Sequence, residues 1–332
     1  MKTKTTKEKK PTLVHEIDKK DWQLYRLAFT PDSRMLILAP KGHDTTVMDL
    51  GSWNCRTFPR PPIAAVRVVF SPDSASFIVT SFNFVPLQCL ETKTNAVRWS
   101  LTPGSMDAEF SPDGKLVAAT QGKSVLLCDT GNGRIHHKMA GHKSRVDHVR
   151  FSADGRRVAS AAQSQVCLWD VQSGTLVAMV QEKQGEISAI TLSGDGHILA
   201  AATGKGSVST YDTITGQKQC EWQAGTSHIW NLHLSADGKR LLDYGRLWEL
   251  PECRQIYQAP PDSLCKFTPD GRALVVLADG MVELVDLEGR SLNKAPLKND
   301  QKMITFAVSP DRNWLACSSS DKLAIWKVDG VL

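Results

Sequence analysis

Residues 141–170 read GHKSRVDHVRFSADGRRVASAAQSQVCLWD, and this stretch decides the fold. At its centre lies the turn Ala153-Asp154-Gly155, which follows an alternating apolar run that ends at Phe151. A second apolar run, residues 158–161, comes directly after the turn. Asp and Gly tolerate the positive φ of a tight turn, so the two runs are predicted to form an antiparallel hairpin.

The same turn phrase recurs along the chain. Each copy is an apolar residue, then Ser or Thr, one variable residue, Asp, and in most copies Gly or Ser. The spacing is about 41 residues, except that the sixth copy precedes the seventh by 33. The copies begin at Phe29, Phe70, Phe110, Phe151, Leu192, Leu234, Phe267 and Val308.

Each unit continues beyond its hairpin in a regular way. Roughly fifteen residues past the turn Asp, a third apolar run ends in an aromatic or apolar residue, often followed by an acid, as in Trp169-Asp170. A turn such as Ser173-Gly174 then leads into a fourth run. Each unit is therefore predicted to form four antiparallel strands.

This pattern resembles the WD40 repeat family over nearly the whole chain. The fourth unit is the most faithful copy, with Gly141-His142, the turn phrase at 151–155 and Leu168-Trp169-Asp170. The resemblance implies a β-propeller, in which four-stranded blades surround a central channel. The strand b to c turn of this unit has Gln163-Ser164 where the family usually places an Asp. We therefore expect the family's buried His–Asp–Ser–Trp network to be complete in no blade, so that apolar packing holds the blades together.

The eight copies predict eight blades, and the alternative is seven, the commonest number in the family. The chain ends at Leu332, just after the third strand of the eighth unit. The N-terminal segment Thr12–Asp18 aligns with an outer strand, so it should complete the last blade and tie the termini together. We expect an all-β fold, a single WD40-type propeller over residues 12–332 with a disordered, Lys-rich leader at 1–11.

The sixth unit is short in two places. The distances from Asp237 to Trp248 and from Trp248 to Phe267 are each four residues shorter than in the fourth unit. Both deletions fall in loops that the fold would place on the same face. We expect a notch or a lowered rim beside the sixth blade.

Charge and composition exclude several classes of protein. The formal net charge is +5, and residues 1–10 supply five Lys against Glu8, so the rest of the chain is nearly neutral. Nucleic-acid binding is therefore disfavoured, and it stays an alternative only through the basic leader. No apolar run approaches the roughly 20 residues of a membrane span. The residues before Pro11 contain no apolar segment, so the sequence predicts no secretory signal.

The eight cysteines are scattered singly, with no CxxC pair. Without a secretory signal, this pattern favours reduced thiols and an intracellular, cytoplasmic protein.

No constellation of residues predicts catalysis or metal binding. The cluster of His136, His137, His142 and His148 beside Asp147 uses metal-ligating residue types, but adjacent His on a strand point to opposite faces. The chain has no GxSxG, HExxH or phosphate-cradling GxxxxGK[ST], so we expect no enzyme and no cofactor. The eight turn acids are explained by hairpin chemistry.

The candidate partner site lies where the innermost strands meet the top of the propeller. In the family resemblance, the residue after the first apolar residue of each such strand faces the top, where partners bind. Several of these residues are aromatic or apolar, as interface hot spots are, although they could instead fill the channel or pack between blades. The positions are Tyr25, Val66, Met106, Asp147, Ser188, Trp230, Ser263 and Ile304, and Phe82 and Phe84 could widen the patch.

The sequence therefore predicts a non-catalytic scaffold that binds a peptide or partner protein on its top face. One alternative is a small-molecule-binding or catalytic propeller that uses the central channel. The other is a nucleic-acid-associated factor assisted by the basic tail. We expect the chain to be monomeric by itself or a subunit of a larger complex.

Overall fold

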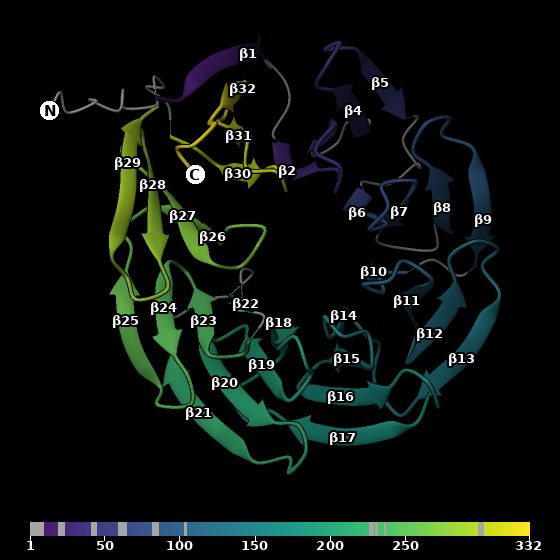
Figure 1. Ribbon diagram of the computed structural model, residues 1–332. Coiled ribbons are helices and arrows are strands. Elements are labelled where there is room, and N and C mark those ends of the chain that lie inside the picture. The colour runs from purple at the N-terminus through teal and green to yellow at the C-terminus, as the bar shows by residue number, and fades with distance from the viewer. Residues whose placement is uncertain are drawn as a thin grey trace, which may run out of the picture.

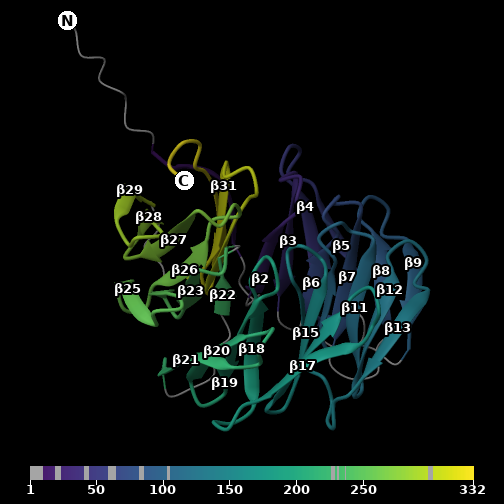
Figure 2. The ribbon, with the colours of Figure 1, turned by 60° about the horizontal axis from the view of Figure 1, so that its bottom comes forward.

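Eight four-stranded antiparallel sheets stand in a ring around a central channel (Figure 1). The computed structural model describes residues 10–18, 24–40, 45–58, 65–81, 86–102, 105–225, 229, 232–235, 237–297 and 302–332. The blades stand side by side around the ring, as the tilted view in Figure 2 shows. The predicted all-β propeller with eight blades is confirmed, and residues 1–9 of the expected leader lie outside the described residues.

We letter the strands of each blade a to d from the channel outward. The a strands of blades 1 to 8 are β2 (Leu24–Phe29), β6 (Ala65–Phe70), β10 (Ala108–Phe110), β14 (His148–Phe151), β18 (Ile187–Leu192), β22 (Leu232–Leu234), β26 (Leu264–Phe267) and β30 (Thr305–Val308). The b strands are β3 (Met35–Pro40), β7 (Ser76–Ser81), β11 (Leu116–Gln121), β15 (Arg157–Ala162), β19 (Ile198–Thr203), β23 (Arg240–Asp243), β27 (Ala273–Ala278) and β31 (Trp314–Ser318).

The two outer layers complete each blade. The c strands are β4 (Thr45–Asp49), β8 (Leu87–Glu91), β12 (Ser124–Asp129), β16 (Gln165–Asp170), β20 (Ser207–Asp212), β24 (Arg246–Glu249), β28 (Met281–Asp286) and β32 (Lys322–Lys327). The d strands are β5 (Cys55–Phe58), β9 (Val97–Leu101), β13 (Ile135–Ala140), β17 (Leu176–Gln181), β21 (Lys218–Gln223), β25 (Arg254–Gln258), β29 (Ser291–Pro296) and, for blade 8, β1 (Thr12–Asp18).

The N-terminal strand closes the ring as predicted. Strand β1 pairs antiparallel with β32, from Thr12 opposite Lys327 to Asp18 opposite Lys322. The ammonium of Lys322 also lies 2.7 Å from a carboxylate oxygen of Glu16. Blade 8 is thus built from both ends of the described chain, which lie together in Figure 1.

Apolar clusters fill the spaces between neighbouring blades. Leu277 of blade 7 packs with Phe306 of blade 8, and Leu36 of blade 1 packs with Ile325 of blade 8. Six further clusters occupy the other six interfaces. Because burying apolar surface stabilises a fold in proportion to the area removed from water, these clusters supply most of the cohesion between blades.

The a–b turns explain the repeated phrase. In blade 4 the Ser152 hydroxyl donates to Asp154 Oδ1 over 2.6 Å, the same oxygen accepts the Arg156 N–H, and Gly155 has a φ of 71°. In all eight turns the Ser or Thr hydroxyl donates to the turn Asp in this way. The turn acids therefore have the structural role that the sequence predicted.

Blade 4 contains a buried polar network that ties strand b to strand c. Ser160 Oγ accepts the Trp169 indole N–H over 2.8 Å and lies 2.7 Å from His142 Nε2. The other ring nitrogen of His142 lies 3.0 Å from Gln165 Oε1. The network lacks the family's aspartate, as expected, but it closes through Gln165, which was not predicted.

Blade 6 is shorter than its neighbours. Its b and c strands have four residues each, against six in blade 4. The turn between them, Tyr244-Gly245, has two residues as in blade 4, so this deletion lies in the strands and not in the loop where we expected it. Both turn residues have positive φ, 35° and 80°. The shorter hairpin agrees with the expected lowered rim.

The expectation that all eight cysteines stay reduced is wrong. Cys220 on β21 and Cys253 in the c–d turn of blade 6 form a disulfide across the interface of blades 5 and 6. The two residues are 33 positions apart and belong to different repeats, so their spacing gave no signal. The remaining six cysteines are free thiols, and only Cys55 among them is exposed.

Candidate functional site

The top face of the propeller carries two adjoining hollows over blades 7 and 8. We define this face as the side that holds the b–c turns and the d–a connections. The hollows have volumes of about 530 Å³ and 460 Å³, and Lys302 and Met303 line both of them. We call the pair the blade 7/8 hollow.

The floor of the larger hollow is apolar. Leu277 at the end of β27 and Leu297 after β29 are both buried, and they belong to the cluster between blades 7 and 8. Leu264 at the start of β26 and the side chains of Met281 and Met303 are half-buried beside them. Flexible thioether side chains adapt to irregular apolar partners, so this floor suits a side chain from another molecule.

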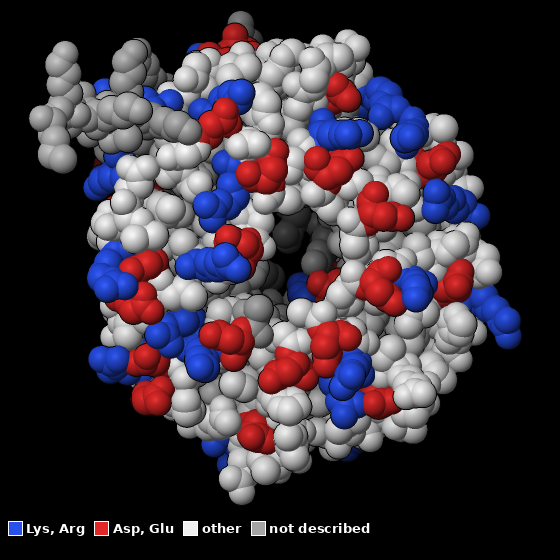
Figure 3. Space-filling view, viewed as in Figure 1, with Lys and Arg blue, Asp and Glu red and all other residues white. Residues whose placement is uncertain are grey.

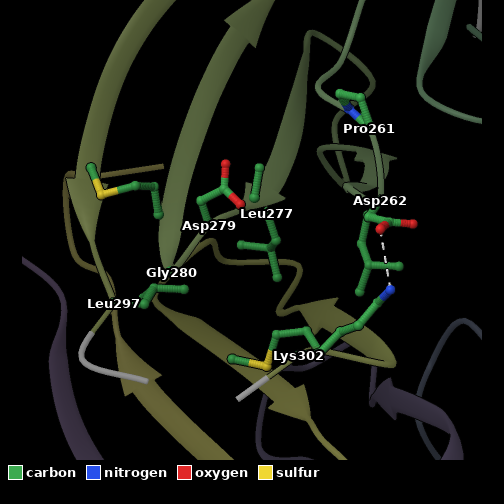
Figure 4. Close-up of a pocket in the computed structure, with 11 residues that line it drawn as sticks. Pro261, Asp262, Leu277, Asp279, Gly280, Leu297 and Lys302 are labelled. Carbon is green, nitrogen blue, oxygen red and sulfur yellow. Dashed lines mark ion pairs between the residues drawn. The ribbon is translucent and has the colours of Figure 1, made fainter. Parts of the chain in front are cut away.

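The rim of the hollow is charged. Asp262 in the connection between blades 6 and 7 forms an ion pair of 3.3 Å with Lys302, and the two side chains point toward each other in Figure 4. Asp279 lies in the b–c turn of blade 7, and Asp321 lines the smaller hollow from the b–c turn of blade 8. The Asp262–Lys302 pair is exposed, so it contributes little to stability and can exchange partners.

The shortened blade 6 shapes one wall of this site. The deletion before Phe267 shortens strands β25 and β26 rather than the connection between them. That connection, residues 259–263, supplies Pro261 and Asp262 to the hollow. This connection packs tightly on the b–c turn of blade 6. A Cβ added to Gly245 in that turn would lie only 3.1 Å from the Cβ of Ala259 in the connection. The sequence feature that predicted a lowered rim therefore lies directly beside the hollow.

Two of the predicted top-face positions lie at or beside the hollow. Ile304 lines the smaller hollow and its side chain is 43% exposed. Ser263 is half-buried between the lining residues Asp262 and Leu264. Lys302 and Met303 were not predicted as site residues, although both directly precede Ile304 in the chain.

The other predicted positions lie elsewhere or cannot be placed. Met106 is half-buried, and half-buried Asp147 forms an ion pair of 3.0 Å with Arg145. Ser188 is buried and donates to the carbonyl of Ile229.

Tyr25 and Val66 belong to β2 and β6, but their side chains lie outside the described part of the structure. Trp230, Phe82 and Phe84 also lie outside the described residues. The predicted patch as a whole therefore stays a prediction.

Charged side chains on the innermost strands link neighbouring blades. Asp107, which is buried beside β10, accepts from the Arg150 guanidinium over 2.5 Å and from the Val149 N–H. Glu109 accepts the Phe151 N–H over 2.6 Å. Acidic side chains also surround the opening of the channel in Figure 3. The contacts of Asp107, Glu109 and Arg150 join blades 3 and 4 to each other.

The histidine cluster considered for metal binding is dispersed. His142 is buried in the blade 4 network, and His137 Nε2 lies 3.1 Å from the carbonyl of Gln172. Among the described residues, no group of three or more His, Cys, Asp or Glu is arranged to hold a metal ion. In the same part of the chain, no helix is long and apolar enough to cross a membrane.

Comparison with known proteins identifies one repeat directly. A family model described as "WD domain, G-beta repeat" matches residues 133–170. That range starts with the d strand of blade 3 and ends with the c strand of blade 4. A repeat that runs d–a–b–c leaves the first d strand to close the last blade, as β1 does. No curated protein matches the chain.

Proposed function

We propose that this chain, an eight-bladed WD40-type propeller, is a protein-interaction scaffold that holds a peptide segment of its partner in the blade 7/8 hollow. WD40 propellers generally bind protein partners and are typically non-catalytic, and a rigid ring contributes surface and position rather than chemistry. The observation that carries the proposal is the combination of an apolar floor and a charged rim at one place on the top face.

The rim favours a particular kind of peptide. Its acids are Asp262, Asp279 and Asp321, against the single lysine Lys302 among the residues that line the two hollows. A peptide with an aliphatic or aromatic side chain beside an Arg or Lys would satisfy both the floor and the rim. Complementary charge at a rim steers encounter and sets specificity more than it adds affinity.

A peptide-display selection tests the proposal. A random peptide library is panned on the purified chain, and the selected peptides are measured against Met303→Asp, which places a carboxylate on the apolar floor. Leu292→Asp, an exposed position on β29 away from the top face, is the matched control. We expect Met303→Asp to weaken binding at least tenfold and the control to bind normally. Peptides that bind both variants equally would refute the proposed site.

Two of the residues predicted from the sequence to lie on the top face are tested in the same peptide-binding assay. Trp230→Ala and Tyr25→Ala are expected to weaken peptide binding if the interface reaches the channel mouth.

An intracellular, cytoplasmic location is also a proposal, since the disulfide removes the argument from free cysteines. A fluorescent fusion of the full chain measures that location.

A further inference from the structure

The d strand of blade 4 differs from the other outer strands in having no charged side chain. Strand β17 reads LVAMVQ, and the uncharged stretch extends over residues 171–181. Each of the other seven d strands contains at least one Arg, Lys, Asp or Glu. Natural sheets commonly protect an edge strand with charges, because a bare edge can pair with another chain. Strand β17 lacks this protection.

The exposed side chains of β17 are mostly large and apolar. Leu176 is 45% exposed, Val177 is 44% exposed and Met179 is 55% exposed. A bulge at Val177 contributes to this, because Trp169 pairs with Leu176 and Leu168 pairs with Ala178, which leaves Val177 as the extra residue. Extra residues in a bulge are turned out of the regular alternation.

The neighbouring blade extends this apolar surface. Ile214, in the c–d turn of blade 5, is 74% exposed. Its turn neighbours Thr213 and Gly216 line a narrow cleft together with Ala178 of β17. We call Leu176, Val177, Met179 and Ile214 the β17 patch. Contiguous exposed apolar surface on a folded protein marks an interaction site.

The backbone of β17 sets the shape of what binds. The strand is the last in its sheet and pairs only with β16 among the described residues. Its outward N–H and C=O groups are spaced to meet an extended strand. An added β-strand is therefore the partner geometry that this edge fits.

We propose that a second copy of this chain pairs with β17 edge to edge, so that two blades 4 form one antiparallel sheet about a two-fold axis. Two-fold symmetry brings each strand against its own copy, so a charge near the centre would meet a like charge. Like charges directly opposite each other destabilise strand pairing. Among the eight d strands of the described structure, β17 is the one that avoids this repulsion at every register, because each of the others carries at least one charge.

This proposal departs from the expected monomer and is independent of the blade 7/8 hollow. The hollow is formed by blades 7 and 8, whereas β17 belongs to blade 4 on the opposite side of the ring (Figure 1). A dimer joined at β17 would carry two hollows, each open to its own peptide.

Sedimentation velocity over a range of concentrations tests the dimer. We expect the wild-type mass to double as concentration rises and Met179→Lys to stay monomeric at every concentration. The matched control is Leu292→Lys, because Leu292 is 58% exposed on β29, a d strand that already carries Lys294. It should dimerise like the wild type. A wild type that stays monomeric, or a Met179→Lys variant that dimerises equally, would overturn the proposal.

Hydrogen exchange of the wild type distinguishes strand pairing from other contacts and needs no variant. The amides of β17 should exchange more slowly at concentrations where the dimer forms, while those of β29 should not change. A dimer whose β17 amides exchange at the monomer rate would also overturn the proposal.

Discussion

Replacing Ser160 by Ala should destabilise the propeller out of proportion to the size of the change. The hydroxyl is fully buried and is the point where the Trp169 indole and the His142 imidazole meet. Removing it leaves two buried polar groups without this partner. Each group costs about 1–3 kcal/mol, so we expect a loss of about 2–6 kcal/mol in the free energy of unfolding.

The expected shift in melting temperature follows from the size of the chain. An unfolding entropy of about 2.1 cal/mol/K per residue gives about 0.7 kcal/mol/K for 332 residues. The loss then corresponds to a decrease of about 3–9 °C in Tm. Differential scanning calorimetry measures it against Ser100→Ala, an exposed serine on the d strand β9. Equal melting temperatures for the two variants would refute the reasoning.

Three further predictions concern pH, the disulfide and the inner strands. Burial lowers the pKa of His142 below its ordinary 6.5, so its neutral form stabilises the fold. That stability is complete above pH 6.5 and is lost as pH falls through 6.5 toward the folded-state pKa, and His142→Gln should flatten the pH dependence of Tm in this window. Cys253→Ser should lower the free energy of unfolding by about 4 kcal/mol, because the disulfide closes a loop of 33 positions. Urea unfolding of the oxidised wild type and of the variant measures this loss, and equal midpoints would contradict the prediction. Asp107→Ala should lower the free energy of unfolding by about 3 kcal/mol. This is the lower end of the range for breaking a buried ion pair, because the Arg150 side chain is 26% exposed. Urea unfolding, with an unchanged m value, measures the loss.

Local sequence predicted the parts of this structure that depend on local geometry. The turn at Asp154 is closed by Ser152, two residues away, so eight copies of the phrase predicted eight hairpins. The place of β1 in the last blade was predictable for a related reason, since a repeat that begins with its d strand leaves one d strand at the start of the chain.

Contacts between residues far apart in the chain escaped prediction, both within a blade and between blades. Gln165 reaches His142 across 23 positions, and Cys253 meets Cys220 across 33. In blade 6, Asp243 occupies the position of Ser160 and accepts from the indoles of Trp222 and Trp248, an arrangement for which the repeat offers no template. Burial raises the pKa of Asp243, against the hydrogen bonds of the two indoles and Arg246.

The candidate site was only partly predictable for the same reason. Its floor and rim come from five separate segments, which include Asp262, Met281, Leu297, Lys302 and Asp321. The sequence predicted a partner site on the top face that includes Ile304. It did not predict the hollow, because the hollow spans two blades and each innermost strand was considered separately.

Methyl NMR on methionine-labelled protein tests the proposed function most directly. The chain has eight methionines, of which Met281 and Met303 line the blade 7/8 hollow, Met106 lies at a predicted top-face position and Met179 lies on β17. On addition of a selected peptide, we predict that the methyl signals of Met281 and Met303 shift while that of Met179 does not. Peptide binding that leaves Met281 and Met303 unshifted would contradict the assignment of the blade 7/8 hollow as the partner site.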